Sequence, residues 1–232
     1  MAGMRGGRAA AVLAGWVIAA GVAAPAAGQS PPDVRTWTGV AMQGRVGPGS
    51  PWRWNSDSLV RARNGAGTLD FVAERVVLTR DVAGRSSVGI GYAYGRGFPD
   101  GGSLREHRFV QQYLWNRGGA GRWLSLKTRV EERYVTGQDS MALRVRQQVR
   151  ITWSLPSRQG LRAVAAEELF VRANSTKLGS RGFDSNRVFL GVARPLTSRS
   201  SLEVGYVNIV WRSASGDARR SHVMSATLAV GL

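Results

Sequence analysis

The sequence predicts an all-β protein, an antiparallel up-and-down transmembrane β-barrel of 10 to 12 strands that follows a cleaved signal peptide. Three observations carry this prediction. Polar and apolar side chains alternate with a period of two residues along most of the chain, which is the spacing of a strand. Short glycine-bearing connections alternate with longer polar ones, as in outer-membrane barrels. After Gln29 no apolar run reaches 18 residues, so the remaining chain contains no candidate transmembrane helix.

The alternation is clearest within residues 125–155. At 100° per residue, Arg144, Arg146 and Arg150 would scatter around a helix, whereas at 180° per residue they share one side. The opposite side is apolar. We therefore expect a strand whose polar face carries Arg144, Arg146, Gln148 and Arg150 and whose apolar face carries Leu143, Val145, Val149 and Ile151.

The same test identifies eleven candidate strands. A bacterial barrel normally has an even number of strands, so the count predicts ten if residues 37–46 do not span, or twelve if another strand lies in the N-terminal third. The alternation changes phase within residues 202–212, which predicts a β-bulge there. The candidates are residues 37–46, 51–63, 67–80, 87–95, 104–116, 123–134, 140–154, 161–172, 183–194, 200–212 and 221–232.

The connections and the aromatic residues indicate how such strands would sit in a bilayer. The three longest polar connections are residues 96–103, 173–182 and 213–220, and counting back from the C-terminus places all three at the same end of the sheet. Tyrosine and tryptophan favour the headgroup level of a membrane. Several of them lie close to expected turns and predict an interfacial belt: Trp115, Trp123, Tyr134, Trp153 and Trp211.

The first 28 residues have the features of a secretory signal. Arg5 and Arg8 precede an apolar stretch, and Ala26-Ala27-Gly28 fits the small-residue pattern of a signal-peptidase site. The expected organisation is a signal peptide at 1–28, a short segment at 29–36 and a single barrel domain at 37–232. Export directs the chain to the outer membrane of a Gram-negative cell.

Composition narrows the partners. The formal net charge is +17, which attracts polyanions without choosing among them. The absence of cysteine excludes a disulfide scaffold and a thiolate zinc site. The arginines alternate with apolar residues and do not cluster with aromatics on one platform, as single-strand binders require. We expect contact with outer-membrane lipid, lipopolysaccharide and, during insertion, the barrel-assembly machinery, and we expect a monomer that binds no nucleic acid.

The two faces of the sheet can meet their surroundings in two ways. In a transmembrane barrel the apolar face meets lipid and the polar face lines the lumen. In the alternative, a secreted soluble β-barrel that binds an anionic or lipidic ligand, the apolar face would form the core. The small face of residues 87–95 would bury little in such a core. We favour the membrane barrel, with a lumen lined by Lys127, Arg129, Glu131, Arg133, Arg144, Arg146, Gln148 and Arg150.

Several phrases resemble a bacterial outer-membrane family catalogued as domain of unknown function 2490. They include "VGIGYAYG" (88–95), "REHRFVQQYLW" (105–115), "LRVRQQVR" (143–150), "AAEELF" (165–170), "GFDSNRVFLGV" (182–192) and "LEVGYVN" (202–208). The resemblance spans roughly residues 37–232 and implies an outer-membrane barrel, with no activity and no catalytic residues to carry over. Many outer-membrane barrels end in Phe or Trp, whereas this chain ends in Leu232.

No catalytic centre, cofactor or metal site is predicted. A barrel-borne hydrolase needs a histidine beside a serine. His107 has no such serine, and Ser221 and His222 are adjacent, so their side chains point to opposite faces. The adjacent glutamates of Glu131-Glu132 and Glu167-Glu168 also point to opposite faces, so neither pair forms a paired-carboxylate site. The histidines are too few for a metal site.

A role can be inferred only as a structural barrel or a narrow pore. The inward cations, Arg162 among them, can pair across strands with Glu131 and with one of Glu167 and Glu168, which would plug a lumen of this size. Excess positive charge would give any residual pore an anion preference. Basic residues in the long connections could contact lipopolysaccharide phosphates: Lys177, Arg181, Arg219 and Arg220.

Overall fold

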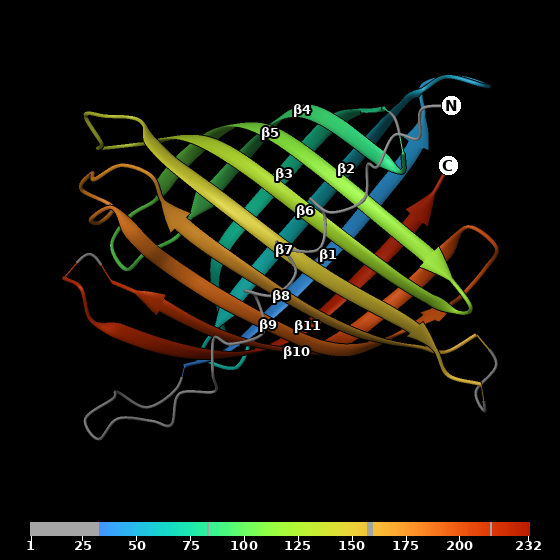
Figure 1. Cartoon of the computed structure of the whole chain (residues 1–232). Helices are drawn as coiled ribbons and strands as arrows, with labels where there is room; N and C mark the ends of the chain where they lie inside the picture. The colour runs from blue at the N-terminus through green and yellow to red at the C-terminus, as the bar shows by residue number, and fades with distance from the viewer. Residues whose placement is uncertain (1–32, 83, 157–159, 214) are drawn as a thin grey trace, which may run out of the picture. The chain divides into compact units, whose positions relative to one another are not determined.

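The structure is a computed structural model that describes residues 33–82, 84–156, 160–213 and 215–232. The expected signal peptide, residues 1–28, lies outside the described residues, as does the N-terminal segment up to residue 32. Eleven strands form a closed barrel (Figure 1). They are β1 (Asp33–Arg45), β2 (Trp52–Arg63), β3 (Thr68–Asp81), β4 (Ser86–Gly97), β5 (Leu104–Gly119), β6 (Arg122–Val135), β7 (Ala142–Ser154), β8 (Arg162–Arg172), β9 (Gly182–Pro195), β10 (Ser200–Arg212) and β11 (Ala218–Gly231).

The barrel closes through a parallel pair of strands. β1 pairs with β11 in parallel, from Asp33 opposite Ser221 to Gln43 opposite Gly231, and each consecutive pair of strands is antiparallel. The eleven candidate strands and the range of 10 to 12 are therefore confirmed, whereas the expectation of an even number is wrong. Residues 37–46 do contribute a strand of the barrel, and an odd number closes because the last contact is parallel. Closure leaves no unpaired sheet edge.

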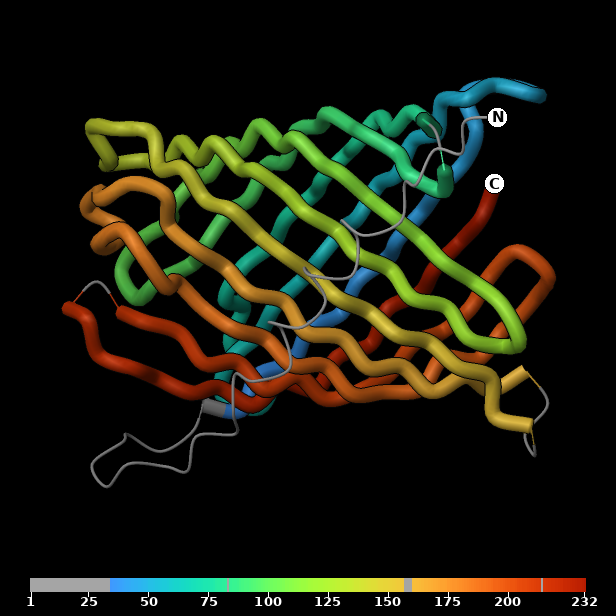
Figure 2. The backbone as a smooth tube through the Cα atoms, in the orientation of Figure 1, coloured from blue at the N-terminus to red at the C-terminus, as the bar shows by residue number. Residues whose placement is uncertain are grey.

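The up-and-down order places the connections at two opposite ends of the barrel (Figure 2). The loop end, at the left of the figure, carries the β2–β3, β4–β5, β6–β7, β8–β9 and β10–β11 connections. The three longest polar connections expected from the sequence are all at this end. The turn end carries the β1–β2, β3–β4, β5–β6, β7–β8 and β9–β10 connections. Because β1 runs parallel to β11, the first residue of β1 is at the loop end and the last residue of β11 is at the turn end.

Turn chemistry follows the sequence closely at the β5–β6 hairpin. Only two residues, Ala120 and Gly121, separate the strands, and their φ angles are 48° and 72°. Positive φ at both central positions is the geometry of a type I′ turn, whose twist matches that of the flanking strands.

The outer face of the barrel is apolar between two levels of arginine. Exposed side chains on this face include Ile90, Phe109 and Leu190, at 66%, 51% and 57% of their full exposure. By the alternation of the strands, the outward arginines all lie within the first or last three residues of a strand. They are Arg80, Arg96, Arg105, Arg117, Arg122, Arg194, Arg212 and Arg220. Within the described residues there is no helix with the length and hydropathy needed to cross a bilayer.

Two aromatic residues assigned to an interfacial belt lie elsewhere. Trp211 packs against the buried cluster of Val207, Ile209 and Val223, which belongs to the inner faces of β10 and β11. Trp123 lines a cavity inside the barrel. Position near a strand end was therefore insufficient to assign a residue to the belt. The alternation along the strand directs these two side chains inward.

The phase change in residues 202–212 also has a different cause from the expected β-bulge. β10 pairs in unbroken register with both β9 and β11. Apolar Val207 and Ile209 simply occupy the inner face, where other strands carry polar residues. The register shifts occur instead between Arg61 and Ala62 and between Phe170 and Val171.

Candidate functional site

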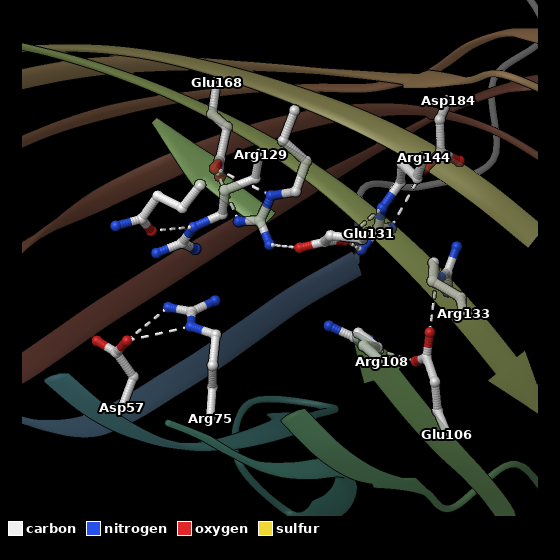
Figure 3. Close-up of polar contacts among 12 residues, drawn as sticks. Asp57, Arg75, Glu106, Arg108, Arg129, Glu131, Arg133, Arg144, Glu168 and Asp184 are labelled. Atoms are coloured by element: carbon white, nitrogen blue, oxygen red, sulfur yellow. Dashed lines mark hydrogen bonds and ion pairs between the residues drawn. The ribbon is translucent and has the colours of Figure 1, made fainter. Parts of the chain in front are cut away.

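The barrel interior contains a network of ion pairs centred on Glu131. Glu131 lies on β6 opposite Arg144 of β7 and is 1% exposed. Arg144 donates to Glu131 Oε2 through Nε at 2.9 Å and Nη2 at 2.5 Å, and Arg146 Nη1 donates to Oε1 at 2.6 Å (Figure 3). Both oxygens of one carboxylate are thus occupied by two guanidinium groups, which fixes the charged groups in one arrangement.

The network continues onto β8 and β9. Arg146 donates to Glu168 Oε1 through Nη2 at 2.7 Å. Asp184 pairs with Arg144 at 3.4 Å and with Arg172 at 2.6 Å. Two glutamates and one aspartate therefore connect three arginines from two strands. The side chains involved are at most 14% exposed.

Both β-bulges place an aspartate in contact with an inward arginine. In β9, Ser185 is opposite Phe170 and Phe183 is opposite Val171, so Asp184 is the extra residue. In β3 the extra residue is Asp70, which accepts a hydrogen bond from Arg35 Nη1 at 2.9 Å. Strict alternation would have aimed Asp184 at the outer surface, and the bulge redirects it.

Further ion pairs and hydrogen bonds lie inside the barrel, within one strand, between neighbouring strands and, for Arg150 of β7 with Glu203 of β10, between strands that are not adjacent. Glu106 of β5 accepts from Arg108 and Arg133, at 2.5 Å each. Arg129 donates through Nε to Gln112 Oε1 at 2.8 Å. Other pairs are Arg75 with Asp57 at 2.7 Å, Arg150 with Glu203, and Arg53 with Asp81.

Aromatic rings also lie against the arginines of the interior. Phe170 is fully buried, and the guanidinium carbons of Arg144, Arg146 and Arg187 lie 5.1, 4.6 and 4.2 Å from its ring centre. Trp37 is similarly flanked by Arg61 at 4.4 Å and by Arg187 at 5.1 Å. Cation–π attraction of this kind is stronger where water is excluded.

The inner face of β4 carries small residues, which leave room for the large side chains of the neighbouring strand β3. A Cβ added at Gly95 would lie 2.5 Å from Phe71 Cζ, and one at Gly91 would lie 2.8 Å from Val77 Cγ2. These glycines let the large side chains of β3 lean across the neighbouring strand. The small residues that argued against a soluble core thus serve the packing of the interior.

The structure places most of the residues expected to line the lumen on the inner face, where they form several separately bonded groups. Arg129, Glu131, Arg144 and Arg146 are buried and bonded as described. Of the two candidate glutamates, Glu168 joins the network, whereas Glu167 bonds Asn186 at 2.9 Å on the outer face. Arg133 bonds Glu106 and Arg150 bonds Glu203, while Gln148 is half-buried opposite Glu168.

Other members of the network were missed by sequence reasoning. Glu106, Asp184, Phe170 and Arg187 belong to it, although none was assigned to the lumen. For Glu106 the signal was available, because the alternation within residues 104–116 places it on the face opposite Phe109 and therefore inside the barrel. For Asp184 no pattern could help, since the bulge breaks the alternation.

Toward the turn end the interior is hollow. A cavity of about 670 Å³ is bounded by inner-face residues of several strands and by Thr197, Ser198 and Arg199 of the β9–β10 turn. A second cavity of about 440 Å³ shares Ala41, Arg162 and other residues with the first. The ion-pair network lies near the loop-end termini of β5 to β9, whereas both cavities extend toward the turn end.

The histidines form no catalytic arrangement. Tyr92 Oη and His107 Nδ1 share a hydrogen bond of 2.5 Å, and Tyr206 Oη is hydrogen-bonded to His222 Nδ1. Both pairs lie on the outer face. Ser221 is buried on the other side of its strand. Among the described residues no cluster of three or more His, Asp or Glu side chains could hold a metal ion.

The basic residues of the long connections are spread over the loop end. Lys177 pairs with Asp139 at 2.5 Å, and both side chains are largely exposed. Arg181 is exposed, and Arg219 lies over the Trp211 ring at 5.7 Å. Arg220 occupies an outward position near the start of β11. They surround the rim and do not converge on one site.

Comparison with known proteins agrees with the resemblance seen in the sequence. An uncharacterised protein of Methylorubrum extorquens, MexAM1_META1p0181, is 30% identical over 203 residues, covering 85% of this chain and 87% of the relative. No solved structure matches. Residues 34–220, which include all strands from β2 to β10, match the family described as "Protein of unknown function (DUF2490)". The chain belongs to that DUF2490 family.

Proposed function

We propose that the protein is an integral β-barrel of the Gram-negative outer membrane, exported by its signal peptide and inserted by the barrel-assembly machinery. The observation that carries the proposal is the outer surface, where an apolar band lies between two levels of arginine. Long cationic side chains at such levels can reach lipid headgroups while their stems cover apolar surface. A closed sheet also satisfies its backbone groups without water, as hydrocarbon requires.

Polar side chains within the apolar band support this reading because they are bonded to one another. Gln111 donates to Glu132 at 3.1 Å, and Thr128 donates to Gln147 at 2.6 Å. Glu74 accepts from Ser56 and Ser58. Polar residues that face lipid are tolerated when their hydrogen-bonding groups have partners.

A secreted soluble barrel is the alternative, and the direction of the side chains disfavours it. Soluble monomers rarely expose continuous apolar patches larger than a few hundred Å², whereas here large apolar side chains of the outer face, such as Ile90, Phe109 and Leu190, are more than half exposed. On β7, the inward Arg144 and Arg146 are each 8% exposed, whereas the outward Ile151 of the same strand is 44% exposed. A soluble barrel would reverse these values.

We further propose that the ion-pair network closes the lumen toward the loop end. Its arginines and carboxylates fill the interior, so the protein acts as a structural barrel or a very narrow pore. The cations outnumber the acids there, and any residual current would be carried by anions. The Phe170 ring, held between three arginines, is central to the closure.

The loop end is proposed to face outward and to contact lipopolysaccharide. Arg96 of β4 and Arg105 of β5 are directly opposite each other on the outer face at this end. Like charges in that position repel, and a phosphate group between them would remove the repulsion. Lys177, Arg181, Arg219 and Arg220 could add contacts from the rim. Lys177 would contribute least, because Asp139 already pairs with it.

Fractionation and electrical recording test the barrel and its closure. The full-length protein should sediment with outer membranes and show heat-modifiable mobility on gels. In planar bilayers we expect no current or a small anion-selective one. Soluble protein in the periplasm would reject the membrane proposal, and large or cation-selective channels would reject the closed lumen.

Lipopolysaccharide retention tests the proposed contacts. Reversing Lys177, Arg181, Arg219 and Arg220 to glutamate should reduce the lipopolysaccharide that co-purifies with the barrel. Reversal of Arg199, a basic residue of the turn end, serves as the control. It should leave the amount of co-purifying lipopolysaccharide unchanged. Unchanged retention in the fourfold variant rejects these contacts.

A further inference from the structure

The open cavity at the turn end contains basic side chains that lack acidic partners. Lys127 and Arg162 line it, and neither forms an ion pair with any residue that the structure describes. The Nε atom of Arg162 is buried without a hydrogen-bond partner. Arg129, which is 5% exposed, bonds only the neutral Gln112. Three basic side chains thus line one cavity, and none of them forms an ion pair with a residue that the structure describes.

The two acids that attract Lys127 and Arg129, Asp57 and Glu168, are already engaged, and Glu168 accepts from Arg146 at 2.7 Å. Asp57 lines the same cavity, and its Oδ2 accepts from Arg75 through Nε at 3.1 Å and Nη2 at 2.7 Å. In the adjoining cavity Glu203 is paired with Arg150. Burying a charge without a partner is costly, so the free energy of the folded barrel would fall if an anion entered.

We propose that this cavity, lined by Lys127, Arg129 and Arg162, binds a small soluble oxyanion that carries two or more negative charges, such as a phosphorylated or polycarboxylated solute. The volume of about 670 Å³ lies within the range of small-molecule sites. Lys127 and Arg129 stand two residues apart on one face of β6, and Arg162 comes from β8. All three side chains line the same cavity, and charge-assisted bonds to phosphate are the strong ones.

The position of the cavity suggests which side supplies the solute. The β9–β10 turn borders its mouth, so it opens at the turn end, and closure of the other end by the ion-pair network belongs to the proposed function. If the loop end faces outward, as proposed above, the cavity opens to the periplasm. That orientation rests on the proposed function, whereas binding itself can be tested on the purified barrel.

Calorimetric titration of the full chain in detergent provides the test, with pyrophosphate as the probe and chloride as the background anion. We expect one pyrophosphate per barrel. Lys127→Gln and Arg162→Gln should each weaken binding by about tenfold or more, since each removes a charge-assisted hydrogen bond. Lys127→Arg should retain most of the affinity. Arg85→Gln, an exposed residue of the β3–β4 turn outside the cavity lining, is the matched control and should bind as the unaltered protein does.

The outcomes separate the site from its alternatives. Heat-modifiable mobility of each variant establishes that it is folded. Absence of pyrophosphate binding to the unaltered protein, or equal losses in Arg85→Gln and Lys127→Gln, would overturn the proposal. Short-chain phosphatidic acid is a second probe, and tighter binding of it than of pyrophosphate would overturn the assignment to a soluble solute. These results do not depend on whether the barrel is found in the outer membrane.

Discussion

Glu131 of β6 and Arg146 of β7 are joined inside the barrel by a hydrogen bond of 2.6 Å. The two strands are neighbours, and the pair is diagonal, because the residue directly opposite Glu131 is Arg144. The same carboxylate binds Arg144 through its other oxygen. Glu131 is therefore the shared acceptor of two buried guanidinium groups. Its loss would leave both without their main acid.

Glu131→Gln should lower the free energy of unfolding by about 3–5 kcal/mol, because removing one partner of a buried pair leaves an uncompensated charge. Urea unfolding in detergent measures this. Glu132→Gln is the matched control, since Glu132 is the next residue and bonds only Gln111 on the outer face. An equal loss in both variants would contradict the central role of Glu131.

The aspartate in the β9 bulge should matter for the same reason. Asp184→Asn removes the acid shared by Arg144 and Arg172, and we expect a loss of roughly 2–4 kcal/mol in unfolding free energy. Asp139→Asn removes an exposed pair with Lys177 and should cost less than about 1 kcal/mol. If the two substitutions are equivalent, the bulge does not serve to place Asp184.

Packing along β4 gives a steric prediction. Gly95→Ala would bring a Cβ to 2.5 Å from Phe71 Cζ, so the ring must move, at a cost of about 1–3 kcal/mol in unfolding free energy. Gly102→Ala, where a Cβ meets nothing within 4 Å, should have little effect. Thermal unfolding of both variants tests whether the small face is required for packing.

The closed lumen predicts an electrical change on truncating Phe170. Phe170→Ala removes the ring between three arginines and should create a measurable anion-selective current in planar bilayers. Phe109→Ala, a truncation of an exposed outer-face ring, should leave the current unchanged. A silent Phe170→Ala barrel that is correctly folded would show that other side chains close the lumen.

Much of the fold was predictable because alternation survives in most strands. Val145 and Arg146 reveal their opposite faces by spacing alone, and Gly121 marks its turn. Closure was not predictable, since nothing in the residues of β1 distinguishes a parallel from an antiparallel last contact. The network was predicted only in outline. Asp184 and Asp70 sit in bulges that break the period, and Trp211 faces inward because of parity, which its position near a turn does not reveal.

The central claim is that apolar side chains face lipid while guanidinium groups lie inside, and neighbouring residues of β7 test it most directly. The chain has no cysteine, so Gln148→Cys and Val149→Cys can each carry a single spin label in reconstituted bilayers. The label at Val149 should collide mainly with oxygen dissolved in lipid. The label at Gln148 should be shielded from lipid and show the lower oxygen accessibility. The reverse order, or equal exposure of both labels to a water-soluble relaxation agent, would contradict the account.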